Sequence, residues 1–216
     1  MPNHVSTNLK ISGSVKEVKR FIAAVKTEKE ALDFSGVYPL PTELKGTTFP
    51  TKIQTVEEIN LIMTKWVMDK KANKLNAWEK EGPIGIGVTQ ETHDALIKKY
   101  GFADWYNWTI ANWGTKWGAY DSTEWTIESE TKRKMVATIS FNTAWSPATG
   151  FFEFASQEYP TLTFELEFAD EGGGFVCTQS LKNGEVTEQE FEWDSEEGIE
   201  IRINVGYGPS EDEDEE

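Results

Sequence analysis

The sequence has little of the chemistry on which most enzymes depend. Its 216 residues include one cysteine, Cys177, and two histidines, His4 and His93. A single cysteine excludes an internal disulfide and a cysteine-based metal cage, and it is typical of a reducing cytoplasm. Neither histidine has a motif around it, so no nucleophile–histidine pair is indicated. We therefore predict a cytoplasmic, non-enzymatic protein without a metal or a cofactor.

Long apolar runs are also lacking. No stretch reaches the roughly 18 residues that a membrane span requires. The N-terminal residues do not lead from a basic region into an apolar one, as those of a signal peptide do. We expect no signal peptide and no membrane association.

Positive charge is scarce in the last third of the chain. Residues 1–149 hold 19 Lys and Arg against 17 Asp and Glu, whereas residues 150–216 hold 2 against 20. The formal net charge of −16 is therefore a property of the last third. Such an asymmetry predicts a basic partner or a role in solubility, and it says nothing about the fold.

The first part of the chain predicts a strand followed by a helix. Apolar and polar residues alternate from Val5 to Ser12, which is the period of a half-buried strand. Ser14 is a good helix N-cap with Glu17 three residues later, and apolar residues then recur at helical spacing to about Thr27.

The middle of the chain predicts a helical insertion at about 55–112. One short extended piece, Phe34 to Tyr38, precedes it within a proline-rich loop. Three helices are then indicated, from Thr55 to about Lys74, from Gln90 to Tyr100 and from Ala103 to Ala111. The glycine run at 82–88 lacks the Lys-Ser/Thr pair of a nucleotide loop.

The remainder alternates mainly between strands and turns, with Asn183-Gly184 as a strong hairpin signal. The predicted elements are strands at 115–129 and 134–143, a helix at 151–159, and strands at 162–168, 175–182, 186–193 and 198–205. We predict an α+β protein with a ferredoxin-like antiparallel sheet, a helical insertion and an acidic C-terminal hairpin. The domain would cover 1–184, the hairpin 185–207 and a disordered acidic tail 208–216.

Tryptophan is abundant where the chain joins the insertion to the sheet. Six of the nine tryptophans lie between Asp104 and Ala148. They would form a core, a stacking platform for a nucleotide, or a protein-binding hot spot. The candidate residues are Trp105, Trp108, Trp113, Trp117 and Trp145 with Lys116. Lys116 is the only cation between Asp104 and Glu130, so we expect no direct binding of nucleic acid.

Carboxylates recur at regular spacing near the C-terminus. Four occupy every second position: Glu188, Glu190, Glu192 and Asp194. In a strand they would project from one face about 6.6–6.8 Å apart, and Glu165 with Glu167 could add a parallel row. Such rows resemble the charge pattern of a nucleic-acid backbone and could occupy a basic groove on another protein. A solvated face or protection of a sheet edge is the alternative interpretation.

Two other sites have weaker signals. Asp104, Asp121 and Glu124 lie near the tryptophans in the sequence, and carboxylate pairs beside aromatic platforms occur in glycoside hydrolases. Nothing fixes their separation, so a hydrolase or a carboxylate metal site is a minor alternative. Phe141 with Phe164 or Phe168 could project from a sheet as RNA-stacking aromatics, but the acidic residues near them disfavour a phosphate ligand.

Several motifs resemble a known family. They are Asn112-Trp-Gly-Thr-Lys-Trp-Gly-Ala-Tyr-Asp121, Phe141-Asn-Thr-Ala-Trp-Ser-Pro147, Tyr159-Pro160 and Asp170-Glu-Gly-Gly-Gly-Phe175. Together they resemble the YubB-type ferredoxin-like family carried by bacteriophages and plasmids. Ala148 stands where that family usually has a second proline, and the acidic part after Gly184 looks like an addition. The resemblance implies the fold and a mobile-element origin, and it brings no catalytic residue with it.

These observations lead to one functional hypothesis and one alternative. The first is a phage- or plasmid-encoded accessory protein in the host cytoplasm that binds and inhibits a basic host protein, such as a nuclease or another defence component. Its contact surface would be the acidic residues at 165, 167, 188, 190, 192 and 194. The alternative is a small-molecule or nucleotide-binding module that uses the tryptophan-rich region.

Overall fold

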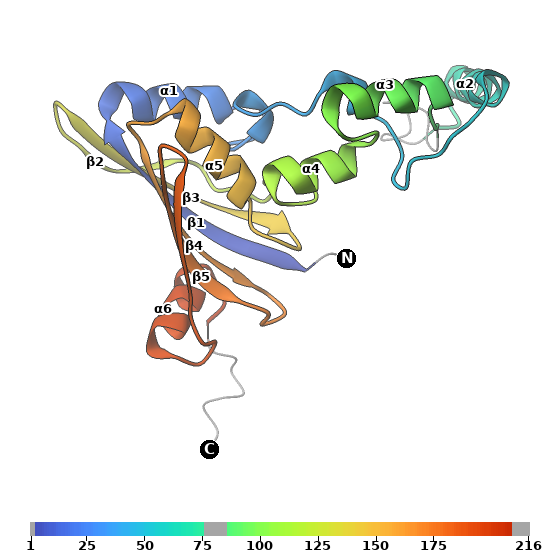
Figure 1. Ribbon diagram of the computed structural model, residues 1–216. Coiled ribbons are helices and arrows are strands. Elements are labelled where there is room, and N and C mark those ends of the chain that lie inside the picture. The colour runs from blue at the N-terminus through green and yellow to red at the C-terminus, as the bar shows by residue number, and fades with distance from the viewer. Residues whose placement is uncertain (1–2, 76–85, 209–216) are drawn as a thin grey trace. The chain divides into compact units, whose positions relative to one another are not determined.

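The computed structural model describes residues 3–75 and 86–208 (Figure 1). The chain divides into two compact units, and the boundary falls within the helix α4 (Trp105–Trp113). One unit, here the sheet unit, comprises Met1–Pro39 and Ile110–Glu216, and the other, the helical unit, comprises Leu40–Thr109. The predicted tail from position 209 onward, and residues 82–85 of the glycine run, lie outside the described residues.

Six strands of the described chain form one antiparallel sheet in the order β2-β3-β1-β4-β5-β6. The strands are β1 (His4–Ser14), β2 (Thr126–Glu130), β3 (Lys134–Ala144), β4 (Thr163–Asp170), β5 (Val176–Lys182) and β6 (Glu185–Glu190). The first four in this order make the ferredoxin-like arrangement, and β5 and β6 extend it by an antiparallel meander. The predicted α+β class and the ferredoxin-like sheet are confirmed.

Two helices cover one face of the sheet (Figure 1). These are α1 (Val15–Val25) and α5 (Thr149–Glu158). Phe21 of α1 and Phe152 of α5 each place a ring 5.2–6.0 Å from that of Phe164 on β4. Phe141 is also fully buried here, so the aromatic residues considered for RNA stacking belong to the core. We call this the covered face, and the opposite side the open face.

Local signals explain where α1 begins. The Ser14 side chain accepts a hydrogen bond from the backbone N–H of Glu17, as the sequence predicts. Such a cap contributes about 1 kcal/mol. The predicted extended piece after α1 is wrong, because Phe34–Gly36 forms a short 3₁₀ helix (η1) that buries Phe34. Its ring stacks on Phe151 of α5 at 4.0 Å, so packing prevails over local propensity.

The prediction of one strand at 115–129 is also mostly wrong. Only Thr126–Glu130 forms a strand, and Tyr120 makes an isolated bridge to Asn142 before it. Between Tyr120 and this strand, the backbone hydrogen-bonds to β3 without forming a strand: the N–H of Thr123 donates to the carbonyl of Ser140.

The C-terminal strand predicted at 198–205 is a helix, α6 (Glu196–Asn204), so the second arm of the acidic hairpin is not a strand. The hairpin across Asn183-Gly184 instead joins β5 to β6. Ser195 accepts a hydrogen bond from the backbone N–H of Gly198, and acidic residues fill the first turn. Ile201 packs against Ala169 and Val176, which anchors α6 on the open face.

The helical unit contains three α-helices in its described part. They are α2 (Val56–Lys71), α3 (Gln90–Tyr100) and the first half of α4, with a short 3₁₀ helix η2 (Thr42–Leu44) before them. Thr55 and Glu58 form the predicted capping box of α2. Gly101 ends α3 in the left-handed conformation with φ +78°. In the described part of the chain, no helix combines the length and the apolar character that a membrane span requires.

Candidate functional site

The open face of the sheet contains a groove of about 530 Å³. All six strands contribute to its lining, and most of the contributing side chains are polar. The polar lining includes Asn8, Lys10, Glu128, Thr138, Glu165, Glu167, Thr178 and Thr187. The volume falls within the range typical of ligand sites, about 300–1,000 Å³. The part of the open face beyond the groove is occupied by α6.

Strand register brings the charged residues of the groove together. Lys10 on β1 is directly opposite Glu165 on β4, and Asn8 is opposite Glu167. The Nζ atom of Lys10 lies 2.9 Å from a carboxylate oxygen of Glu165, and both side chains are about half exposed. The register thus joins residues that stand more than 150 positions apart in the sequence.

Lys10 is the central cation of an acidic cluster. Its pKa is raised first by the hydrogen bond to Glu165 and by the charge of that carboxylate, and further by Glu128 and Glu167, whereas burial acts in the opposite direction. One ammonium among three carboxylates leaves the groove with a net negative charge. A positively charged group entering the groove would therefore be attracted rather than repelled.

One end of the groove is tied to α6. The Nδ2 of Asn8 donates to the carbonyl of Asn204 at 2.7 Å, and the Nδ2 of Asn204 donates to Glu167 at 3.1 Å. Beyond this point the hydroxyl of Tyr207 donates to the carbonyl of His4 and accepts from Ser6. These bonds hold the carboxylate of Glu167 at the rim of the groove.

The two predicted rows of carboxylates lie on opposite faces of the sheet. Glu165 pairs with Ser180, whereas Glu188 pairs with Gln179. Because neighbouring residues of a strand point to opposite faces, Glu165 and Glu167 project from the open face, and Glu188 and Glu190 from the covered face. Glu188 accepts a hydrogen bond from the side chain of Gln179 there. The prediction of a single acidic surface made by all six residues is therefore wrong.

Glu192 and Asp194 do not continue the row of β6, which ends at Glu190. The carbonyl of Glu192 accepts hydrogen bonds from the backbone and the side chain of Ser195, in the turn that begins α6. The carboxylate of Asp194 is exposed and lies 3.9 Å from the guanidinium of Arg202. Both residues thus belong to the segment that leads into α6 and not to a strand.

The two tryptophan motifs lock together. Thr115 donates a buried hydrogen bond to the carbonyl of Ala144, and Ser146 donates to the carbonyl of Gly114. The indole of buried Trp113 donates to the carbonyl of Tyr38 at 2.9 Å. Gly114 has φ +85°, and a Cβ there would meet the carbonyl oxygen of Pro147 at 3.0 Å. Many of the contacts made by these two motifs therefore stabilise the fold.

The predicted tryptophan cluster is divided between the units. Trp108, which is buried, and Trp105 belong to the helical unit, whereas Trp113, Trp117 and Trp145 belong to the sheet unit. Trp117 is 36% exposed and lies beneath the ammonium of Lys116, at 4.5 Å.

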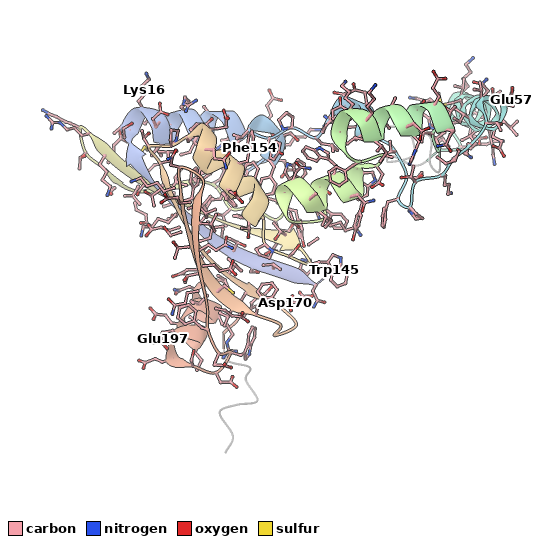
Figure 2. All side chains as sticks on the ribbon, viewed as in Figure 1. Lys16, Glu57, Trp145, Phe154, Asp170 and Glu197 are labelled. Atoms are coloured by element: carbon pink, nitrogen blue, oxygen red, sulfur yellow. The ribbon has the colours of Figure 1, made fainter. Side chains whose placement is uncertain are left out.

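Trp145 is the most exposed of the tryptophans in the sheet unit. It is 50% exposed and projects from the end of β3 (Figure 2). Its φ of +73° is uncommon for a bulky residue, and its backbone N–H donates to the carbonyl of Asn3. Tyr120, which contacts the Trp117 ring, has its pKa raised to about 12 by burial and then by nearby carboxylates.

Of three further candidates, Asp104 and Cys177 are buried, whereas Glu124 forms an ion pair at the surface. Asp104 is buried and accepts hydrogen bonds from Thr51 and from the backbone N–H of Asn107. The second of these bonds caps the N-terminus of α4. Glu124 pairs with Lys26 at 2.5 Å. Cys177 is buried in β5, and burial raises the pKa of its thiol to about 12. Within residues 3–75 and 86–208 no three His, Cys, Asp or Glu side chains are grouped to hold a metal ion.

Two groove residues were missed by sequence reasoning. Lys10 stands on the polar side of the predicted first strand, but its three carboxylate neighbours come from strands that are far from it in the sequence. Glu128 lies at an irregularity in the β2–β3 pairing, between Ile127 and Ser129. A bulge changes which face a side chain reaches, so simple alternation could not place Glu128.

The architecture defines an α+β, ferredoxin-like domain. Residues 124–215, from just before β2 onward, match the family described as the ferredoxin-like domain in Api92-like protein. This part of the chain therefore contains a ferredoxin-like domain similar to that of Api92-like protein.

A comparison with solved structures also found a similar chain. The chain is similar to the crystal structure of protein api92 from Yersinia pseudotuberculosis, with 11% identity and a TM-score of 0.45, over 88% of this chain and 98% of that one. No curated protein matches it.

Proposed function

We propose that this chain is a non-enzymatic accessory protein of a phage or plasmid that binds a basic host protein in the cytoplasm and inhibits it. The partner would be a nuclease or another defence component with a cationic surface. Of the acidic residues named by the sequence, Glu165 and Glu167 would make the contact, joined by Glu128.

The observation that carries this proposal is the groove on the open face. Its lining holds three carboxylates and one ammonium, so the carboxylate charge is incompletely neutralised within the groove. A lysine or arginine side chain of a partner would replace the missing positive charge. Hydroxyl groups of the lining, such as those of Thr138 and Thr178, would accept its remaining hydrogen bonds.

The surrounding charge supports a basic protein over a nucleic acid. The last third of the chain carries 20 acidic and 2 basic residues, and this field would accelerate encounter with a cationic partner. A phosphate backbone would be repelled from the same face. Binding should weaken with salt, because the screening length is only about 8 Å at 0.15 M ionic strength.

Two charge-matched variants test the proposal. Glu128→Gln/Glu165→Gln/Glu167→Gln removes three charges from the open face, and Glu188→Gln/Glu190→Gln/Glu192→Gln removes three from β6 and the turn after it. Each tagged protein is used to capture basic proteins from host lysate at low and high salt, with quantification by mass spectrometry. We expect the first variant to lose at least about tenfold of the wild-type capture and the second to retain it.

The outcomes separate three situations. Loss with the second variant alone would move the contact to the β6 side and overturn the assignment to the groove. Capture that both variants retain would overturn the electrostatic proposal altogether. Circular dichroism of both variants confirms that the fold is unchanged.

A second candidate function is supported by the exposed aromatic residues. Trp117, with Lys116 above its ring, and Trp145 offer a stacking surface and a cation to a nucleotide or a similar small molecule. Nucleotide-dependent quenching of tryptophan fluorescence that disappears in Trp117→Ala or Trp145→Ala would favour this function. A response retained in both variants would exclude these residues as the platform.

A further inference from the structure

Helix α2 has an unusual surface for a helix of its length. It has 16 residues, and none of them is buried. Among its apolar side chains, Leu61 is 72% exposed, Met68 63% and Val56 55%. A capping box starts the helix, but most helical stability in proteins comes from packing of an apolar face. The exposed side chains therefore mark a surface that gains stability when it is covered.

Three of the exposed apolar side chains form a seam with a groove beside it, whereas Leu61 and Met68 lie at least about 100° around the helix from these three. At about 100° per residue, Val56, Met63 and Val67 fall within an arc of roughly 40° on one side of the helix. A groove of about 310 Å³ runs along the C-terminal half, lined by Met63, Thr64, Val67, Met68 and Lys71. The seam continues past this groove to Val56 near the N-terminal end. The groove is large enough to admit an apolar side chain of the size of valine.

The charges at the two ends of the seam are opposite. Glu57 lies in the first turn and Lys71 in the last, and at about 100° per residue the two fall on the same flank of the seam. Consider two α2 helices that lie antiparallel with their midpoints side by side. A residue of one copy then lies level with the residue of the other copy for which the two residue numbers sum to about 127. Val56 of one copy then lies level with Lys71 of the other, and Glu57 lies within one residue of the same level. The surface is thus complementary to itself.

We infer that α2 is the contact through which two copies of this chain associate, as an antiparallel pair related by a two-fold axis near Met63. Val56 of each copy enters the groove beside Val67 of the other, and Glu57 pairs with Lys71 at both ends. Such an arrangement buries the same patch of both chains, as a closed two-fold contact requires. It also places the N-terminus of each helix beside the C-terminus of the other, so the two helix dipoles attract each other.

The size of the surface sets the strength of association. A pair of 16-residue helices is smaller than the standard interface of roughly 1,600 Å². We therefore expect a reversible dimer rather than an obligate one. Its formation does not depend on the proposed groove partner, so either proposal can fail alone.

Sedimentation of the full chain at about 5–300 µM tests the inference, because weak interfaces associate in this range. The wild type should shift from monomer to dimer as the concentration rises. Met63→Glu and Val67→Glu should remain monomeric throughout, since each places a carboxylate in the seam. Both residues are exposed, so these variants should fold. Lys65→Glu, on the opposite side of the helix, should dimerise like the wild type.

Charge reversal tests the antiparallel geometry. Glu57→Lys and Lys71→Glu should each raise the dimer dissociation constant at least about threefold, and the double variant should restore it. A wild type that is monomeric at every concentration would overturn the inference, whether α2 is covered by its own chain or by a different protein. Dimerisation unaffected by Met63→Glu, or the absence of rescue in the double variant, would contradict the proposed pairing.

Discussion

The two faces of the sheet differ sharply in chemistry although they share the same strands. On the covered face, Phe164 has no exposed surface and contacts aromatic rings of α1 and α5. On the open face, its neighbour Glu165 is about half exposed and pairs with Lys10. One step along the chain therefore separates a residue that stabilises the fold from one available to a partner. The alternation of side chains along a strand is what permits this division.

The same comparison explains why charge counts alone do not locate a surface. The sequence places Glu165, Glu167, Glu188 and Glu190 in two similar alternating runs. The register directs the two pairs to opposite faces, and only the first pair joins the groove. What matters for binding is which carboxylates converge, and how far neighbouring cations already neutralise them.

The largest expected effect separates neighbouring residues of β4. Phe164→Ala should lower the free energy of unfolding by about 3–5 kcal/mol, because it leaves a cavity among the rings of Phe21 and Phe152. Glu165→Ala should change it by less than about 1 kcal/mol, since its ion pair is half exposed. Urea denaturation of both variants measures the difference. Similar losses for both would contradict the distinction between the faces.

The rate at which Cys177 is labelled by a thiol reagent tests the covered face, and here we expect an effect of intermediate size. Its pKa is raised to about 12 by burial, with a smaller contribution from Glu188 and Glu190. Because the protonated form is favoured, little thiolate is present at pH 8, and labelling by a thiol reagent should be at least about 100-fold slower than in the unfolded chain. Reaction kinetics with and without denaturant provide the comparison. Rapid labelling of the native protein would show that the covered face opens readily.

The smallest effect concerns the helix that occupies part of the open face. Ser195→Ala removes the hydrogen bond to the backbone N–H of Gly198 and should cost about 1 kcal/mol of stability. Ser14→Ala removes the equivalent cap of α1 on the covered face and serves as the matched control. Equal losses measured by denaturation would indicate that α6 is as integral to the fold as α1. A negligible effect of Ser195→Ala would indicate that α6 is held mainly by Ile201.

Local pattern was sufficient for much of the fold. The alternation from Val5 to Ser12, the cap at Ser14 and the Asn183-Gly184 turn each identify an element correctly, because these signals act over a few residues. Pattern failed after Ser195, where the predicted strand at 198–205 is absent. There the cap and the packing of Ile201 on β4 and β5 favour a helix instead.

The candidate site was only partly accessible from the sequence. Glu165 and Glu167 could be named because they alternate with apolar residues in a strand. Lys10 and Glu128 join them through pairings between distant strands, and the bulge in β2 depends on its partner. Register is fixed by the assembled core rather than by neighbouring residues, so the composition of the groove could not be read in advance.

The most direct test of the account follows threonine methyl groups on both faces by NMR during titration with a lysine-rich peptide at about 0.15 M salt, where nonspecific attraction is screened. Thr138, Thr178 and Thr187 line the groove, whereas Thr7 and Thr143 are buried on the covered face. We predict saturable shifts of the three groove methyl groups, little change at the other two, and loss of the response in Glu128→Gln/Glu165→Gln/Glu167→Gln. Absence of binding, or shifts that persist in this variant, would contradict the assignment of the acidic groove as the contact for a basic partner.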